Sequence, residues 1–165
     1  IENSTTPLVL DADALNCVAK QPEILLRKKA PIIITPHPGE MSRLTGLATP
    51  LVNAERERVA LDFAQKYGVV TVLKGAGTVI ASPNGKVLVN PTGNSGMATG
   101  GSGDVLAGMT TSILAQGASP FSSAAAAVYL HGLAGDIAAE KYGKISMLPT
   151  DLINCIPLAY KRCGF

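Results

Sequence analysis

The chain has 165 residues, of which 47% are hydrophobic and 16% are charged, with 14 Lys and Arg against 12 Asp and Glu. A chain of this size forms one domain or part of a larger one, and its apolar content excludes a disordered tail. The near-neutral charge and the aromatic share of 4% argue against a nucleic-acid partner. Three cysteines without a CxxC or Cys/His cluster argue against a disulfide framework and a structural zinc site, and predict a cytoplasmic location.

The longest uncharged stretch of the chain, residues 105–135, raises the question of a membrane span. It contains His131, and Gly117–Pro120 divides it into two shorter apolar pieces. We therefore predict a pair of buried helices in this stretch and no contact with a membrane.

Short apolar runs predict the strands of a sheet. Residues 7–10, 31–35 and 69–73 are apolar without polar alternation, which is typical of central parallel strands that are covered on both faces. Residues 78–89 then have the pattern of a β-hairpin, with Asn84–Gly85 at its turn.

Helices are predicted between and after these strands. The first runs from Asn53 to Tyr67, with Asn53 as its N-cap, Gly68 as its stop and the charged residues 55–58 facing water. Three more follow a glycine-rich loop, over residues 104–116, 120–141 and 149–162. This order of elements predicts a layered α/β/α fold with a mainly parallel central sheet, in a single partial domain over residues 1–165.

Polar sequences follow each of the three parallel strands, at the edge where an open α/β sheet binds its ligands. They are Asp11–Asp13, Thr35–Glu40 and Lys74–Thr78. We expect Asp11 and Asp13 to point the same way from an extended segment, where they either share Mg²⁺ through water or cap the helix that follows.

The strongest local signal is the loop Thr99–Asp104, which contains three glycines and leads into an apolar helix. Glycines let the backbone approach a ligand closely, and the start of a helix offers unpaired N–H groups, so the loop predicts a cradle for a phosphate group. Asp104 would lie beside that phosphate and take a proton from an attacking hydroxyl. The alternative is a tight glycine turn with Asp104 as a simple cap, because neither the Walker pattern nor GxGxxG is present.

Three further features each allow two interpretations. The loop Lys74–Thr78 either binds a nucleotide with its amides and the Thr78 hydroxyl, or is a turn with a solvated lysine. His37, which lies between two prolines, either hydrogen-bonds a substrate or ends a strand. His131 lies in an apolar helix, where a packed core histidine is more common than a ligand.

Five motifs occur along the chain in order. They are VLDADALN at 9–16, TPHPGEM at 35–41, LKGAGT at 73–78, NSGMATGGSGD at 94–104 and HGLAGD at 131–136. Together they resemble the ADP/ATP-dependent NAD(P)H-hydrate dehydratases, the carbohydrate-kinase-like domain of the YjeF type within the ribokinase-like superfamily. The resemblance covers nearly the whole chain.

The resemblance implies a hydro-lyase that repairs NADHX and NADPHX, the hydrated forms of the reduced nicotinamide cofactors. In this family a nucleotide phosphorylates the added hydroxyl, and elimination of phosphate then restores NADH or NADPH. The TPHPGE form implies ADP as the usual donor, with ATP as the alternative. Mg²⁺ would neutralise the phosphate charge.

By the same resemblance, Asp104 is the base that acts on the hydroxyl and contacts the hydrated nicotinamide, and His37 binds the hydrated dinucleotide. The amides at 101–103 would hold the transferring phosphoryl group. The residues implied to bind the nucleotide are Lys74, Gly75, Ala76, Gly77, Thr78, Gly101, Ser102 and Gly103.

Members of this family carry an N-terminal portion with further strands ahead of the DADALN strand, and none of it is present here. We therefore expect an open sheet edge that is completed by a homo-oligomer or by a complementing N-terminal segment. Two alternatives to the dehydratase are a ribokinase-like small-molecule kinase that stops at the phosphorylated product, and a nucleotide-binding remnant without catalysis. Asp104 argues against the remnant, which needs no base.

Overall fold

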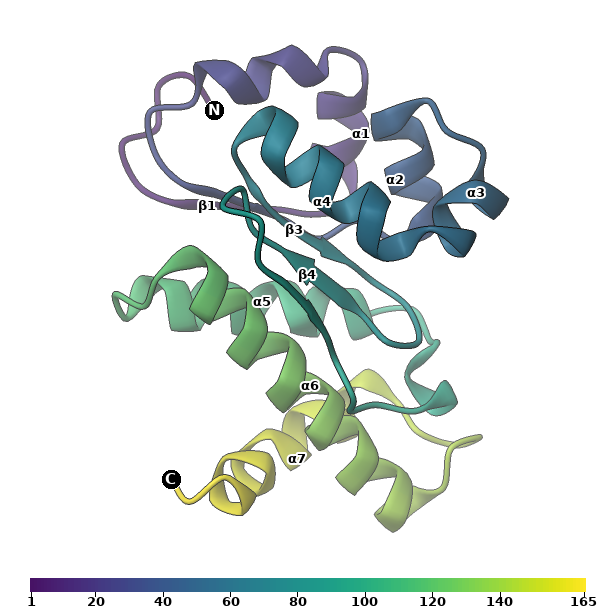
Figure 1. The fold of residues 1–165 in the computed structure, drawn as a ribbon. Coiled ribbons are helices and arrows are strands. Elements are labelled where there is room, and N and C mark those ends of the chain that lie inside the picture. The colour runs from purple at the N-terminus through teal and green to yellow at the C-terminus, as the bar shows by residue number, and fades with distance from the viewer.

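A five-stranded sheet with helices on both of its faces makes up the fold (Figure 1). The computed structural model describes all of residues 1–165. The strands lie across the sheet in the order in which they follow along the chain. They are β1 (Leu8–Leu10), β2 (Ile32–Ile34), β3 (Val70–Leu73), β4 (Val79–Ala81) and β5 (Val87–Val89).

The first three strands run parallel and the last two form a hairpin, as the sequence predicts. Leu8 pairs with Ile32 between β1 and β2, and Ile33 pairs with Val70 between β2 and β3. β4 runs antiparallel to both β3 and β5, and Gly85 takes a φ of +88° in the hairpin turn. The sheet is therefore mixed: parallel over its first half and antiparallel over the hairpin.

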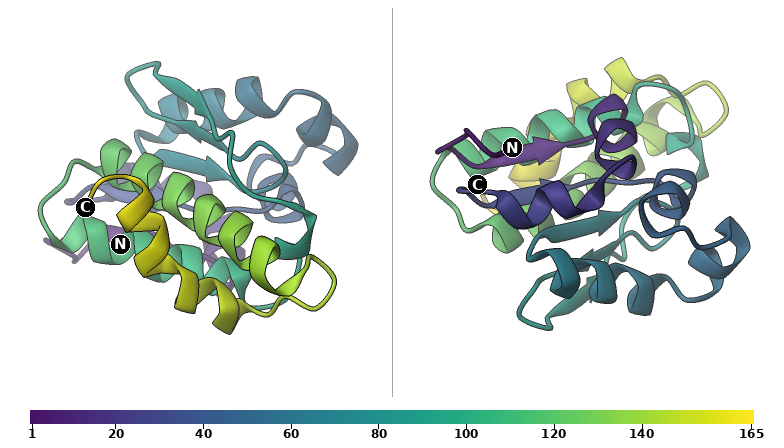
Figure 2. Two further views of the ribbon diagram at one scale, coloured as in Figure 1. Left: turned by 90° about the horizontal axis from the view of Figure 1, so that it is seen from below. Right: turned by 90° about the horizontal axis from the view of Figure 1, so that it is seen from above.

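The two faces of the sheet are covered by different halves of the chain (Figure 2). One face carries α1 (Asp13–Ala19), the 3-10 helix η1 (Pro22–Arg27), α2 (Pro38–Thr45), α3 (Thr49–Ala54) and α4 (Arg56–Tyr67). The other face carries α5 (Ser102–Ala115), α6 (Pro120–Tyr142) and α7 (Pro149–Arg162), with a short 3-10 helix η2 (Ser95–Met97) ahead of α5. The predicted α/β/α layering is confirmed.

Three consecutive isoleucines in β2 show how the sheet feeds both cores. Ile32 and Ile34 pack with Phe63 on the α4 side, whereas Ile33 packs with Leu106 on the α5 side. This division follows from the strand geometry, because successive side chains point to opposite faces. β2 is therefore buried on both faces. It pairs with β1 on one side and with β3 on the other, and so sets where these two strands end relative to each other.

One predicted helix is in fact two helices. α3 and α4 lie on either side of Glu55, whose φ of −125° and ψ of 42° interrupt the helical geometry. The prediction of a single helix over 53–67 is therefore wrong, and Asn53 lies inside α3 instead of capping a helix. The helical segment also starts earlier than predicted, because Pro50 is favourable in a first helical turn.

The aspartates after β1 are also placed differently from the prediction. The chain turns at Ala12, which has a φ of +48°, and α1 starts at Asp13. Asp11 and Asp13 therefore do not share an extended segment, and no side chain caps α1.

The three C-terminal helices lie close to their predicted ranges. α5 starts at Ser102, slightly ahead of the predicted start, because Gly101 with a φ of +95° provides its N-cap. α6 and α7 start at Pro120 and Pro149, as predicted. None of the helices is long and apolar enough to cross a membrane.

Candidate functional site

Residues from the ends of all three parallel strands meet at one edge of the sheet. The Nζ atom of Lys74, after β3, lies 2.6 Å from Oδ1 of Asp11 and 3.9 Å from Oε2 of Glu40. The Lys74 side chain is only 20% exposed, so the interpretation as a solvated turn lysine is wrong. The predicted convergence of the three segments is confirmed.

The turn at Ala12 places Asp11 in this group. Ala12 combines a φ of +48° with a ψ of −118°, and it is the one residue other than glycine with a positive φ. Strain of this kind persists only where the surroundings hold it, and it gathers at functional sites. Its position directly after Asp11 favours a functional role for this edge of the sheet.

The start of α5 lies against the same group. A Cβ atom added to Gly103 would lie 3.4 Å from Lys74 Nζ and 3.8 Å from Asp11 Oδ2, so the glycine turn packs against the ion pair. The Ser102 amide donates to a carbonyl in the preceding turn, whereas the amides of Gly103 and Asp104 have no acceptor within the protein. Free amides at the positive end of a helix, next to a lysine ammonium, can bind an anion.

Asp104 lies in the first turn of α5 with its side chain exposed. No hydrogen bond or ion pair within the protein involves its carboxylate, so Asp104 is not the simple cap that was the alternative interpretation. A free carboxylate next to free amides can accept a proton from a hydroxyl that is held at the same place.

His37 is the N-cap of α2. Its Nδ1 accepts hydrogen bonds from the amides of Gly39 (3.0 Å) and Glu40 (3.3 Å), while its own amide donates to Glu40 Oε2 (2.7 Å). Because Nδ1 accepts, the neutral ring carries its proton on Nε2. β2 ends at Ile34, so His37 starts α2 and does not end the strand. Its side chain is 52% exposed, and its Nε2 lies 3.6 Å from Oε1 of Glu40, which is beyond hydrogen-bond distance, so a ligand could still accept from this N–H.

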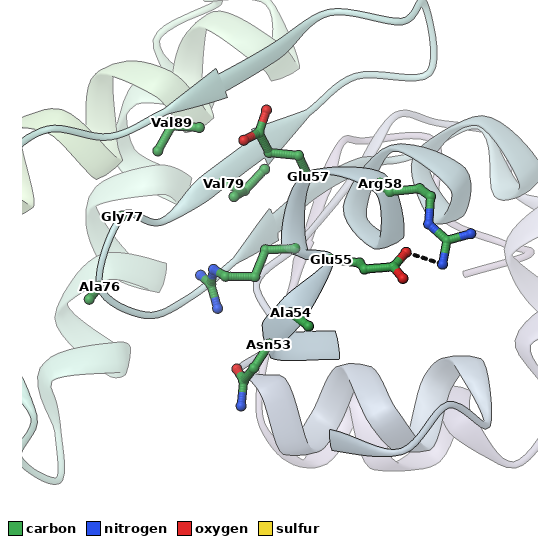
Figure 3. A pocket seen from close by; sticks show the side chains of 10 residues that line it. Asn53, Ala54, Glu55, Glu57, Arg58, Ala76, Gly77, Val79 and Val89 are labelled. Carbon is green, nitrogen blue, oxygen red and sulfur yellow. Dashed lines mark ion pairs between the residues drawn. The ribbon is translucent and has the colours of Figure 1, made fainter. Parts of the chain in front are cut away.

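The loop of residues 74–78 also borders a cavity of about 440 Å³, shown in Figure 3. Ala76 and Gly77 line it together with residues from β4, β5 and the start of α4. Within the loop, the Thr78 hydroxyl donates to the Gly75 carbonyl (3.0 Å) and accepts from the Gly75 amide (3.3 Å). The hydroxyl thus holds the shape of the loop.

Arg56 lies against this loop from the α4 side. Its Nη2 donates to the Leu73 carbonyl (2.8 Å), and a Cβ atom added to Gly75 would lie 3.0 Å from both Nη1 and Nη2. Burial lowers the pKa of Arg56 from its usual value. The prediction that residues 55–58 face water is therefore wrong for Arg56, which supports the backbone where β3 ends.

Residues 1–158 match the model of one protein family, which is described as NAD(P)H-hydrate dehydratase. The chain belongs to this family. Among its dehydratase relatives, the bifunctional NAD(P)H-hydrate repair enzyme Nnr of Moorella thermoacetica is 47% identical over 156 residues, which are 94% of this chain and 29% of that protein. The ADP-dependent (S)-NAD(P)H-hydrate dehydratase of Neisseria meningitidis is 44% identical over 144 residues, 86% of this chain and 49% of that protein.

Solved structures of dehydratases have the same fold. The ADP/ATP-dependent NAD(P)H-hydrate dehydratase from Bacillus subtilis, co-crystallised with ATP and Mg²⁺, superposes with a TM-score of 0.89 at 36% identity. That match covers 98% of this chain and 57% of the other. A ribokinase-like superfamily protein from Enterococcus faecalis has a TM-score of 0.78 at 33% identity. The chain thus has a ribokinase-like fold and spans between 29% and 57% of the three dehydratase relatives described here.

Several residues of this candidate site were not predicted from the sequence. Glu40 was part of a motif but had no predicted role, although the spacing from His37 to Glu40 is that of a capping box. The pairing of Asp11 with a lysine was not predicted, and Arg56 was predicted to face solvent. The pairing of Asp11 with Lys74 has no local signal, because the two residues are far apart in the chain and meet only across the sheet.

His131 is a packed core histidine, as the sequence favoured. Its Nε2 lies 3.0 Å from the Ser102 carbonyl oxygen, and the residue is 8% exposed. Burial lowers the pKa of His131 from 6.5 to about 4, with a smaller opposing effect of the hydrogen bond to Ser102. The folded protein therefore holds this ring neutral at pH 7.

A pH dependence of stability follows from this burial. The unfolded chain binds a proton at His131 below its ordinary pKa of 6.5, and the folded chain binds it only below about 4. We therefore expect His131 to lower the free energy of unfolding by up to about 3 kcal/mol as the pH falls through this window. Urea unfolding of the wild type and of His131→Leu at several pH values measures the difference. If the free energy of unfolding fell with pH by the same amount in the two proteins, the expectation would be contradicted.

Proposed function

We propose that this chain converts NADHX and NADPHX to NADH and NADPH in a reaction that consumes ADP or ATP. The observation that carries the proposal is the meeting of the free Gly103 and Asp104 amides, the Lys74 ammonium and the free Asp104 carboxylate at one sheet edge. A base for the acceptor hydroxyl, an anion cradle and a nearby positive charge are parts that phosphoryl transfer uses. The substrate and the donor are those after which the dehydratase relatives are named.

Asp104 is the base in this proposal. Its carboxylate takes the proton of the hydroxyl that hydration added to the nicotinamide ring, and the hydroxyl oxygen attacks the terminal phosphorus of the nucleotide. The bond from that phosphorus to the rest of the nucleotide breaks. Inorganic phosphate then leaves the ring carbon with its bonding electrons, and loss of a proton from the neighbouring carbon restores the double bond.

The nucleotide lies along the start of α5 and the loop 74–78 in this proposal. The amides of Gly101, Ser102 and Gly103 face the transferring phosphoryl group, and the Lys74 ammonium offsets its charge. The rest of the loop, from Gly75 to Thr78, contacts the remaining parts of the nucleotide. In the structure the Ser102 amide is the one already engaged, over a long 3.3 Å hydrogen bond to Thr99.

His37 binds the hydrated dinucleotide in this proposal. Its Nδ1 is occupied by the α2 amides, which leaves the Nε2 proton, 3.6 Å from Oε1 of Glu40 on a half-exposed ring, as the donor for a ligand. A donor in this position suits a carbonyl or phosphate oxygen of the substrate. The buried Glu40 carboxylate accepts the His37 amide and thereby holds the backbone of the donor in place.

The residues at this edge fit a magnesium ion that is shared with the nucleotide. Mg²⁺ usually binds through one or two carboxylates together with phosphate oxygens and water. Asp11 is the carboxylate here that would reach such an ion, because Lys74 engages only its Oδ1, whereas Glu40 is buried and its Oε2 accepts from the His37 amide. When bound, the ion would neutralise charge on the phosphates.

β1 is an edge strand of the sheet, and this edge is open to a partner. β1 pairs only with β2, and its residues Leu8–Leu10 are partly exposed. An apolar strand edge of this kind favours pairing with another strand. We propose that a second copy of the chain or a complementing N-terminal segment covers it, and sedimentation of the isolated chain tests the first option: a monomer at all concentrations would contradict it.

Replacing Gly103 with valine tests the phosphate cradle. Even the Cβ atom would lie 3.4 Å from Lys74 Nζ, so the larger side chain crowds the space between the turn and the ion pair. We expect ADP binding to weaken by at least about tenfold, which is the loss of about one good hydrogen bond to a charged group. Gly108→Val is a matched control in the same helix, because no atom lies near a Cβ at that position. Equal ADP affinity of the two variants would remove the turn from the nucleotide site.

The products test the reaction itself. NADHX is incubated with the chain, Mg²⁺ and ADP, and inorganic phosphate and NADH are both measured. The dehydratase releases about one phosphate for each NADH that it recovers, because each turnover eliminates one phosphate. A kinase that stops after transfer would leave the phosphate on the alcohol, and a binding remnant would form neither product.

A further inference from the structure

The HGLAGD motif in α6 has no role in the reaction proposed above, yet it contacts the glycine-rich loop at both ends. At the first end, the Asp136 carboxylate accepts hydrogen bonds from the Gly93 amide (2.9 Å) and from Nδ2 of Asn94 (3.0 Å). Nδ2 of Asn94 also donates to the Gly135 carbonyl (3.0 Å). The loop is therefore tied to α6 where it leaves the hairpin.

Two glycines of α6 allow this close approach. A Cβ atom added to Gly132 would lie 2.2 Å from Oγ1 of Thr92 and 2.8 Å from its backbone carbonyl carbon. A Cβ atom added to Gly135 would lie 2.3 Å from Sδ of Met97. Residues 92–97 thus lie directly on the surface of the helix, where no side chain would fit between them.

The other end of the loop is tied by His131. Its Nε2 lies 3.0 Å from the carbonyl oxygen of Ser102, the first residue of α5, and both residues are buried. The ring is neutral at pH 7 and so has one N–H. Because a carbonyl oxygen can only accept, this proton lies on Nε2, which donates to Ser102. The hydrogen bond therefore holds the turn whose next two amides, of Gly103 and Asp104, are free.

We propose that His131 and Asp136 are positioning residues, which hold the phosphoryl cradle and Asp104 at a fixed place relative to Lys74 by anchoring both ends of the loop 93–102 to one helix. The proposal rests on the proposed function, because it assigns the anchored turn to phosphoryl transfer. Asp136 lies five positions after His131 in α6, so one helix sets the span between the two anchors. Displacement of reacting groups by about 1 Å costs about 100-fold in rate, which is why such anchoring matters.

Substitutions at His131 separate positioning from general stability. Gln places an amide N–H near the position of Nε2, whereas Leu fills similar space without a donor. We expect His131→Leu to lower kcat by about 10- to 100-fold, with the KM for NADHX within about threefold of the wild type. We expect His131→Gln to recover kcat to within about threefold. Ile137→Ala is the matched control, because Ile137 is buried in the same helix and packs in the core.

Hydrogen exchange provides a readout that needs no substrate. In the chain without ligand, His131→Leu is expected to speed exchange of the Ser102 and Val105 amides, which donate to carbonyls of this turn, whereas Ile137→Ala is expected to leave them at the wild-type rate. If the wild type shows no turnover, the proposed function fails, and the exchange result still decides whether His131 holds the loop. Wild-type exchange in His131→Leu, equal loss of kcat in Ile137→Ala, or failure of glutamine to restore activity would each overturn the proposal.

Discussion

Replacing Asp104 with asparagine is expected to abolish turnover of NADHX while the nucleotide still binds. Asparagine has nearly the same shape as aspartate but cannot take the hydroxyl proton, so the loss should be about 10²- to 10⁴-fold in kcat, the usual contribution of a general base. Because Asp104 makes no hydrogen bond or ion pair within the protein, its substitution should leave the fold and the cradle intact. Rates of NADH recovery and equilibrium binding of ADP measure the two effects.

The matched control for this prediction is Asp62→Asn. Asp62 is exposed on α4, so the substitution removes the same charge without touching the sheet edge. We expect its kcat within about twofold of the wild type. Activity of Asp104→Asn within a few-fold of the control would show that Asp104 is not the base, and a large loss of ADP binding would show that it holds the nucleotide instead.

Replacing Lys74 with methionine is expected to weaken both the fold and the binding of nucleotide. The Lys74 ammonium lies 2.6 Å from Asp11, and both side chains are largely buried, at 20% and 13% exposed. Removal of the cation leaves the Asp11 carboxylate without its partner, so we expect a loss of about 3 kcal/mol in the free energy of unfolding. Loss of the positive charge beside the cradle should weaken ADP binding by about tenfold or more. Lys86→Met, in the exposed hairpin turn, is the control for loss of a lysine.

A double substitution separates these two effects of Lys74. Adding Asp11→Leu to Lys74→Met removes the unpaired carboxylate, so the free energy of unfolding should rise again, since an apolar replacement of a buried pair is often nearly neutral. ADP binding should stay weak, because the positive charge is still missing. Recovery of ADP affinity together with stability would mean that Lys74 acts only through the fold.

The sheet and its layers were predictable from the sequence because they depend on local patterns. The three apolar runs have no polar alternation, and Ile32–Ile34 are indeed buried on both sides. Asn84–Gly85 predicted the hairpin because a glycine supplies the positive φ that its turn requires. The strand ends also predicted where Asp11, Glu40 and Lys74 would gather, since parallel strands end at one edge.

The contacts that shape the site were not predictable, because they join residues that are distant in the chain. Nothing near Lys74 indicates that β1 will deliver Asp11 to it across β2. Arg56 has the charged neighbours of a solvated helix face, yet it turns toward the Leu73 carbonyl once α4 packs beside β3. The break at Glu55 has no glycine or proline to signal it, so the pattern over 53–67 predicted one helix. The sequence favoured a core histidine at 131 but could not identify Ser102 as its partner.

In the proposed function, this chain recovers NADH from NADHX with a nucleotide as phosphoryl donor. The most direct measurement incubates the chain with NADHX and Mg²⁺, with ADP, with ATP or without nucleotide, and follows the formation of NADH. We expect NADH to form only with nucleotide, faster with ADP than with ATP, and not at all with Asp104→Asn. No NADH formation by a folded chain that still binds ADP would contradict the claim.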